Sequence, residues 1–179
     1  MFRQYADCRL WGLCTALFLV GTVAAQPPEM PKPSAEHAYL KKMVGEWDCK
    51  MKMMGMELAC KHTYELVGDF WLTGKFKGDL GGMPLEGRDT LGYDPIKKKY
   101  VSSWIDNMSP HYTVMTGTWD EATKTMTSEG TGMGMDGKPT KMKDINKWKN
   151  DDEMTTTMHE EKDGKWVEMF TIEYKRVKK

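Results

Sequence analysis

Two stretches of the sequence place polar and aromatic side chains at every second position, the spacing that puts them on one face of a β-strand. The two sets are Tyr100, Ser102, Trp104 and Asp106, and Met142, Asp144, Asn146 and Trp148. Carboxylate, amide and hydroxyl groups beside indole rings can hold the polar end of a small, otherwise apolar molecule. On the inner side of a sheet these groups need hydrogen-bond partners. The alternative is that both faces point to solvent.

A third candidate lies within residues 58–66, where His62 and Tyr64 share a face with apolar side chains. The four histidines are far apart and show no H-x-H or H-E-x-x-H spacing, so no zinc site is predicted. A hydrogen-bonded core histidine is the plain interpretation of His62, and a haem ligand is the alternative. No Ser-His-Asp set or Gly-rich phosphate loop is present, so no catalytic residue is predicted.

The chain contains 17 methionines, four of them within residues 51–56. Thioethers are soft ligands that suit Cu(I), which makes a copper site one hypothesis. Methionine also fills irregular cores and adaptable pockets without a metal, and its spread over the whole chain favours that role. We therefore predict no cofactor, with copper and haem as alternatives.

Two cysteines flank a predicted tight turn at Met54-Gly55. A two-residue turn there places Cys49 directly opposite Cys60 on the neighbouring strand, at a Cα separation compatible with a disulfide. The sequence thus predicts a Cys49–Cys60 bond if the protein is exported. Two buried free thiols are the alternative.

The amino-terminal residues follow the order of a secretory signal. Arg3 and Arg9 precede an uncharged apolar run over 10–20, and Ala24-Ala25 supplies small residues for cleavage after Ala25. We expect residues 1–25 to be a signal peptide and 26–33 a Pro-rich linker, with a periplasmic or extracellular mature protein. A retained membrane anchor is the alternative, although the apolar run is about half the length that spans a bilayer.

The charge balance excludes some partners. Lys and Arg together number 26, as do Asp and Glu, and the mature chain stays close to neutral. We therefore predict no nucleic-acid binding and, after signal cleavage, no attraction to an anionic membrane.

The elements that position these residues follow from the hydrophobic period. Residues 34–44 have helical spacing with Ser34 as the expected N-cap, and from Glu46 onward the period is two. Turn signals such as Asp136-Gly137 and Asp163-Gly164 favour tight two-residue hairpins. About ten consecutive strands predict an all-β, antiparallel up-and-down barrel over residues 34–179, because closure removes exposed edges. An open sheet or a sandwich is the alternative.

Several motifs occur in a familiar order: Gly45-Glu46-Trp47, Met83-Pro84-Leu85-Glu86-Gly87, Leu91-Gly92-Tyr93-Asp94, the run 99–108, and Gly117-Thr118-Trp119-Asp120. From about His37 to Arg176 the chain resembles the bacterial domain of unknown function 1579 family. The resemblance implies a small lipocalin-like barrel with an internal cavity, and it brings no catalytic residues. The tight turn at Met54-Gly55 departs from the family, which has a longer insertion there.

Together these observations predict an exported β-barrel that binds a small, largely apolar molecule. The alternatives are an enzyme that uses Asp106 or His62 as acid or base in the same cavity, and a purely structural or interaction domain.

Overall fold

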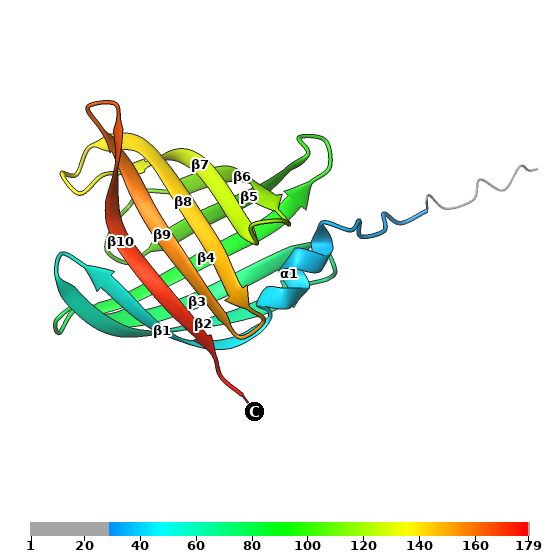
Figure 1. Cartoon of the computed structure of the whole chain (residues 1–179), viewed down its shortest axis with the longest axis horizontal. Coiled ribbons are helices and arrows are strands. Elements are labelled where there is room, and N and C mark those ends of the chain that lie inside the picture. Colours follow the sequence, from blue (N-terminus) through cyan, green and yellow to red (C-terminus); the bar gives the residue numbers. More distant parts are fainter. Residues whose placement is uncertain (1–28, 179) are drawn as a thin grey trace, which may run out of the picture. The chain divides into compact units, whose positions relative to one another are not determined.

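The protein forms a closed barrel of ten antiparallel strands in a computed structural model that describes residues 29–178 (Figure 1). Each strand pairs with the next along the chain, and β10 pairs with β1 to close the ring. The expected up-and-down barrel is thus confirmed, whereas the expected signal peptide lies outside the described residues. The elements are α1 (His37–Met43), β1 (Gly45–Met53), β2 (Met56–Val67), β3 (Trp71–Asp79), β4 (Pro84–Asp94), β5 (Lys99–Asp106), β6 (Thr113–Asp120), β7 (Thr125–Met133), β8 (Pro139–Asn150), β9 (Glu153–Lys162) and β10 (Lys165–Arg176).

Alternation along the strands directs one set of side chains into the barrel. In β1, for example, Trp47, Cys49 and Met51 are buried while the residues between them are exposed. The period-two pattern of the sequence therefore matches the pleat of each strand.

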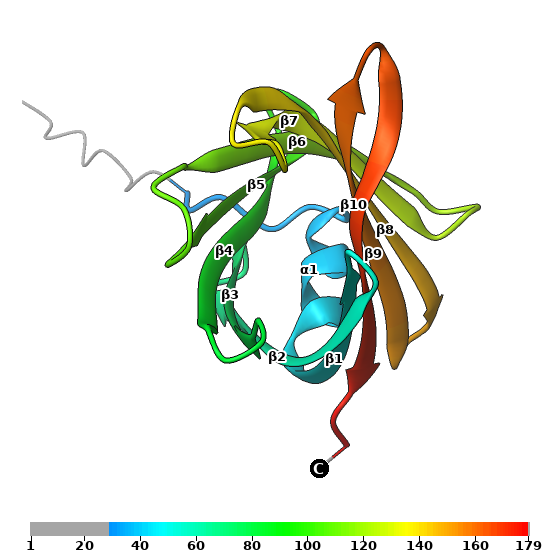
Figure 2. The same ribbon diagram turned by 90° about the vertical axis from the view of Figure 1, so that its left-hand side faces the viewer.

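Helix α1 lies across one end of the barrel (Figure 2). Tyr39, Leu40 and Met43 are buried in the core, and the indole of Trp47 donates a 2.9 Å hydrogen bond to the Met43 carbonyl. Within residues 29–178 no helix is long and apolar enough to cross a bilayer.

The helix begins two residues later than the sequence predicts, with Glu36 rather than Ser34 at the N-cap position. Ser34 does not cap it, because both the backbone N–H and the hydroxyl of Ser34 lie 3.0 Å from Nδ1 of His37. This local contact holds Ser34 in the turn that precedes the helix, and the N-cap residue Glu36 forms no capping hydrogen bond through its side chain.

Two of the predicted hairpins have the expected two-residue turns. Met54-Gly55 and Asp163-Gly164 both adopt left-handed backbone at both positions, with φ of 51° and 78° and of 51° and 74°. These angles suit the right-handed twist of the flanking strands. The prediction for Asp136-Gly137 is wrong: Met133 pairs with Pro139, so the turn has five residues, and the Met135 N–H donates to the carboxylate of Glu160.

Cys49 lies opposite Cys60, as the predicted turn requires, but the structure does not contain the predicted disulfide. Both thiols are free, and each donates to the carbonyl two residues before it, over 3.6 Å for Cys49 and 3.7 Å for Cys60. Counted from the turn, the two cysteines form a hydrogen-bonded pair, in which the Cα atoms are farther apart and a bridge is strained. The separate hydrogen bonds satisfy both thiols without that strain.

Arg176 stabilises the seam, which is the pairing of the last strand, β10, with the first strand, β1. Its guanidinium donates to the carbonyls of Lys42, Val44 and Asp151 over 2.5–3.2 Å and lies 4.1 Å from the centre of the Trp47 ring. One side chain thus joins α1, β1, β10 and the β8–β9 turn.

Candidate functional site

The barrel contains an internal cavity of about 310 Å³ beneath α1. Eight methionines contribute to its wall, together with aromatic residues and several polar side chains. The methionines are Met43, Met51, Met115, Met126, Met133, Met142, Met158 and Met169. The lining is therefore mostly apolar and deformable, which suits a binding site for a small molecule.

The predicted face of β5 points into this cavity. Trp104 and Asp106 both line it, and the indole N–H of Trp104 donates to Oδ2 of Asp106 over 2.7 Å. The indole crosses above Gly87 on β4, where a Cβ atom would lie only 2.2 Å from the ring. Gly87 is thus the residue that lets Trp104 lie flat against the wall.

Asp106 has little free capacity for acid or base chemistry. Its Oδ1 accepts hydrogen bonds from the backbone N–H groups of Met108 and Ser109, both at 2.8 Å, in addition to the indole bond at Oδ2. The carboxylate therefore shapes the turn after β5 and orients Trp104. This geometry argues against the role of Asp106 in the enzyme alternative.

The predicted face of β8 also reaches the cavity, through Met142, Asp144 and Asn146. The Asn146 amide donates to Oδ2 of Asp144 over 3.1 Å, and its Oδ1 accepts from the Thr156 hydroxyl over 2.8 Å. Oδ1 of Asp144 is shielded from solvent and has no hydrogen-bond partner in the described part of the chain.

Burial raises the pKa of Asp144 to about 7, and the hydrogen bond from Asn146 only partly offsets this effect. The side chain keeps some accessibility because it lines the cavity, but protein surrounds the carboxylate. A carboxyl group in such surroundings favours its neutral form. Asp144 is therefore ionised in only part of the molecules near neutral pH.

A histidine and an aspartate form a pair on the adjacent wall. Nε2 of His62 lies 2.8 Å from Oδ1 of Asp89, the ring stacks on Tyr64 at 3.9 Å between centroids, and His62 is 3% exposed. Nδ1 of His62 is buried and has no partner among the described residues. Strands β2 and β4, which carry this pair, are separated by β3.

Gly74 on β3 makes that contact possible. A Cβ at Gly74 would lie 1.9 Å from Oδ1 of Asp89 and 2.5 Å from Nε2 of His62. The missing side chain leaves the space in which a residue of β2 meets a residue of β4 over the intervening strand.

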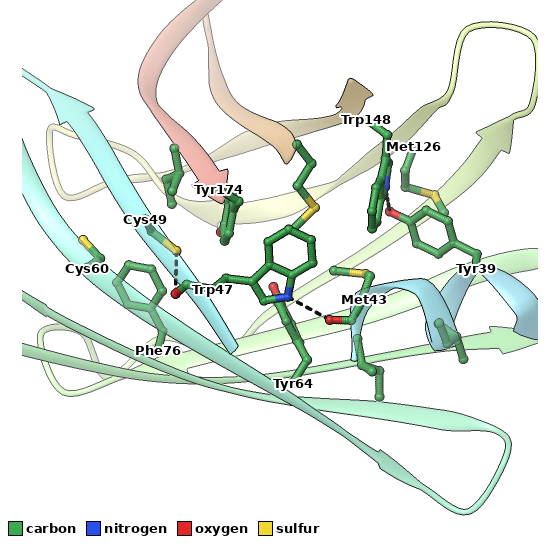
Figure 3. Close-up of a cluster of buried hydrophobic side chains, with 14 of the residues drawn as sticks. Tyr39, Met43, Trp47, Cys49, Cys60, Tyr64, Phe76, Met126, Trp148 and Tyr174 are labelled. Atoms are coloured by element: carbon green, nitrogen blue, oxygen red, sulfur yellow. Dashed lines mark hydrogen bonds between the residues drawn. The ribbon is translucent and has the colours of Figure 1, made fainter. Parts of the chain in front are cut away.

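Tyr100 and Trp148, two of the predicted ligand-binding residues, do not line the cavity. The Tyr100 hydroxyl donates to the Glu36 carbonyl over 2.9 Å, and the Trp148 indole N–H lies 3.5 Å from the Tyr39 hydroxyl (Figure 3). Both residues stand near the ends of their strands that meet α1, where they hold the helix in place. The remaining predicted residues, His62, Tyr64, Ser102, Trp104, Asp106, Asp144 and Asn146, all line the cavity.

Sequence reasoning missed Asp89 and Thr156. Asp89 shares the inward face of β4 with Leu85, Gly87 and Leu91, and Thr156 is buried on β9. The alternation around each residue indicated that its side chain points inward. It did not indicate that Asp89 contacts a residue of β2.

The methionines of residues 51–56 do not converge on one point. Met51 lines the cavity, while Met54 and Met56 are 75% and 47% exposed at the turn. Within residues 29–178 no three His, Cys, Asp or Glu side chains lie close enough together to hold a metal ion. The local methionine cluster is thus divided between the core and the surface.

The end of the barrel opposite α1 is surrounded by five hairpin connections. Exposed hydrophobic side chains occur in four of them, at Met54, Met83, Met135 and the pair Met108 and Tyr112. These five side chains leave apolar surface exposed at this end of the barrel.

Comparisons with known proteins identify a family for this chain and one solved structure that shares its fold. A family model described as "Protein of unknown function (DUF1579)" matches residues 32–176. Among solved structures, Rv2717c from M. tuberculosis has 13% sequence identity and a TM-score of 0.60 over 82% of this chain and 100% of its own. A de novo designed fluorescence-activating β-barrel has 12% identity and a TM-score of 0.45 over 77% of this chain and 96% of its own. No curated protein matches the chain.

Proposed function

The chain belongs to the DUF1579 family, and we propose that this protein binds a small, largely apolar molecule inside its barrel. The observation that carries the proposal is the cavity of about 310 Å³, which falls at the lower end of the sizes typical of small-molecule sites. A purely structural barrel of this width would gain stability by filling the space with side chains.

Unpartnered polar atoms at the cavity support binding further. Nδ1 of His62 and Oδ1 of Asp144 are both buried without a hydrogen bond among the described residues. Such groups cost stability in a dry core, because they lose water without gaining a partner. A bound molecule or an ordered water that meets them would remove this cost.

The experiment is binding of a fluorescent apolar dye by the purified protein, with native mass spectrometry to detect co-purified molecules. Ser102→Leu adds bulk inside the cavity, and we expect it to abolish dye binding while the barrel stays folded. Thr116→Leu introduces the same leucine side chain at an exposed position on β6 and is the control. Equal binding by Ser102→Leu and the unmodified protein would contradict the proposal.

The His62–Asp89 pair favours a second candidate, acid–base chemistry on the bound molecule. A histidine held by a carboxylate at one nitrogen, with its other nitrogen unpartnered, has the arrangement of an oriented base. His62→Gln would then retain binding and lose turnover of a substrate. Loss of binding and turnover together would instead assign His62 to ligand contact.

We also propose that the protein is exported, on the basis of the signal-like order of residues 1–25. Amino-terminal sequencing of the native protein is the test. A mature chain that begins at Gln26 would support export, and one that begins at Met1 would contradict it.

A further inference from the structure

Among residues 29–178, acidic but no permanently basic groups line the cavity. Asp89, Asp106 and Asp144 line it together with His62 and His111, and no lysine or arginine does so among residues 29–178. Yet the protein has equal numbers of acidic and basic residues overall. The excess of acidic over basic groups is therefore a property of the cavity, and it determines the charge that a bound ligand would meet.

The three carboxylates differ in what already contacts them. Asp89 is held by His62, and Asp106 accepts three hydrogen bonds from neutral N–H groups. Asp144 receives one hydrogen bond, from the neutral amide of Asn146. In the described part of the chain neither Asp106 nor Asp144 forms an ion pair, so Asp144 is the carboxylate with most capacity left.

Aromatic groups surround the same space. Tyr39, Tyr64, Phe76, Trp104 and Tyr174 contribute to the lining. The π-faces of such rings attract cations, and the attraction grows where water is excluded. A cavity wall of aromatic and thioether groups, with one carboxylate that receives a single hydrogen bond, accommodates an organic cation better than an anion.

We propose that the natural ligand is an amphiphilic amine, whose ammonium group meets Asp144 and whose apolar body lies among the methionines and aromatic rings. This inference rests on the proposed function and names its ligand class. The ammonium supplies the hydrogen-bond donor and the positive charge that the Asp144 carboxylate lacks. A fatty acid would instead bring a second anion to a site whose lining, in the described part of the chain, includes no lysine or arginine.

The test measures the affinities of three probes of equal chain length, decylamine, decanol and decanoate, by calorimetric titration of the purified protein at pH 8. We expect decylamine to bind about tenfold or more tightly than decanol, as a charge-assisted hydrogen bond would provide, and decanoate to bind most weakly. Asp144→Asn should remove the preference for decylamine over decanol. Asp48→Asn, an exposed aspartate on the outer face of β1, is the matched control and should change neither.

The outcomes separate the two proposals. If none of the three probes binds, the proposed function fails. If decanol and decanoate bind as tightly as decylamine, the cavity binds apolar chains but the amine inference is overturned. If the preference for decylamine survives Asp144→Asn, the assignment of Asp144 is overturned.

Discussion

Replacement of Asp144 by asparagine should stabilise the ligand-free barrel at alkaline pH. Burial raises the pKa of Asp144 from 3.8 to about 7. A group whose pKa is higher in the folded protein binds its proton more tightly there, so its contribution to stability is complete below pH 4 and is lost as the pH rises through about 7. Above pH 7 the folded protein holds a poorly solvated carboxylate, which asparagine removes.

The size of the effect follows from the pKa difference. The interval from 3.8 to about 7 corresponds to about 4 kcal/mol at pH 8. Asparagine keeps the hydrogen bond with Asn146 but leaves an amide N–H without a partner in place of Oδ1, which costs about 1–2 kcal/mol. The remaining accessibility of Asp144 toward the cavity reduces the gain further. We expect a net stabilisation of about 2 kcal/mol.

Urea denaturation at pH 8 and at pH 4.5 measures this difference. The unfolding free energies of Asp144→Asn and the unmodified protein should differ by about 2 kcal/mol at pH 8 and by less than about 1 kcal/mol at pH 4.5. Asp48→Asn controls for the loss of a carboxylate at an exposed strand position, where Lys61 lies 3.8 Å away. A destabilised Asp144→Asn variant at pH 8, or an equal effect at both pH values, would refute the reasoning.

Three further predictions concern other parts of the barrel. Gly74→Ala should lower the unfolding free energy measured in urea by about 2 kcal/mol or more, because its Cβ enters the space of the His62–Asp89 contact. The added change Asp89→Ala should restore part of the loss. If the effects of the two changes are additive, the contact is contradicted. Cys49 and Cys60 should resist alkylation in the folded protein and react in urea, since burial raises the pKa of both thiols. Mass spectrometry measures the labelling, and rapid labelling of the native protein would disprove this. Arg176→Lys should lower the unfolding free energy by about 1–3 kcal/mol, because a lysine cannot reach several carbonyls at once, and an unchanged urea midpoint would show that the seam does not depend on the guanidinium.

The fold was accessible from the sequence because strand, turn and core signals agree with one another. The apolar alternation through Trp47, Cys49 and Met51 predicts which face of β1 is buried, and the Met54-Gly55 turn predicts its register with β2. The start of α1 was less accessible, since the contact between Ser34 and His37 depends on how the chain enters the helix. Local patterns thus predicted the elements but not every boundary.

The site was predictable only in part, because alternation gives the direction of a side chain but not its depth along the barrel. It correctly directs Trp104 and Asp144 inward, and by the same rule it includes Tyr100 and Trp148, which lie where α1 fills the end of the barrel. The contact between His62 and Asp89 depends on the absence of a side chain on the intervening strand. No single-strand pattern contains that information.

The seam between β1 and β10 has a consequence for how the chain acquires its structure. Nine of the ten strand pairings join neighbours in sequence, so they can form hairpin by hairpin, whereas Trp47 and Arg176 meet only after every other strand has been made. Until β10 is in place, β1 and β9 each present an unpaired edge that can pair with another chain. A chain that folds hairpin by hairpin therefore passes through an open sheet, and its exposed edges disappear only when the last strand pairs with the first.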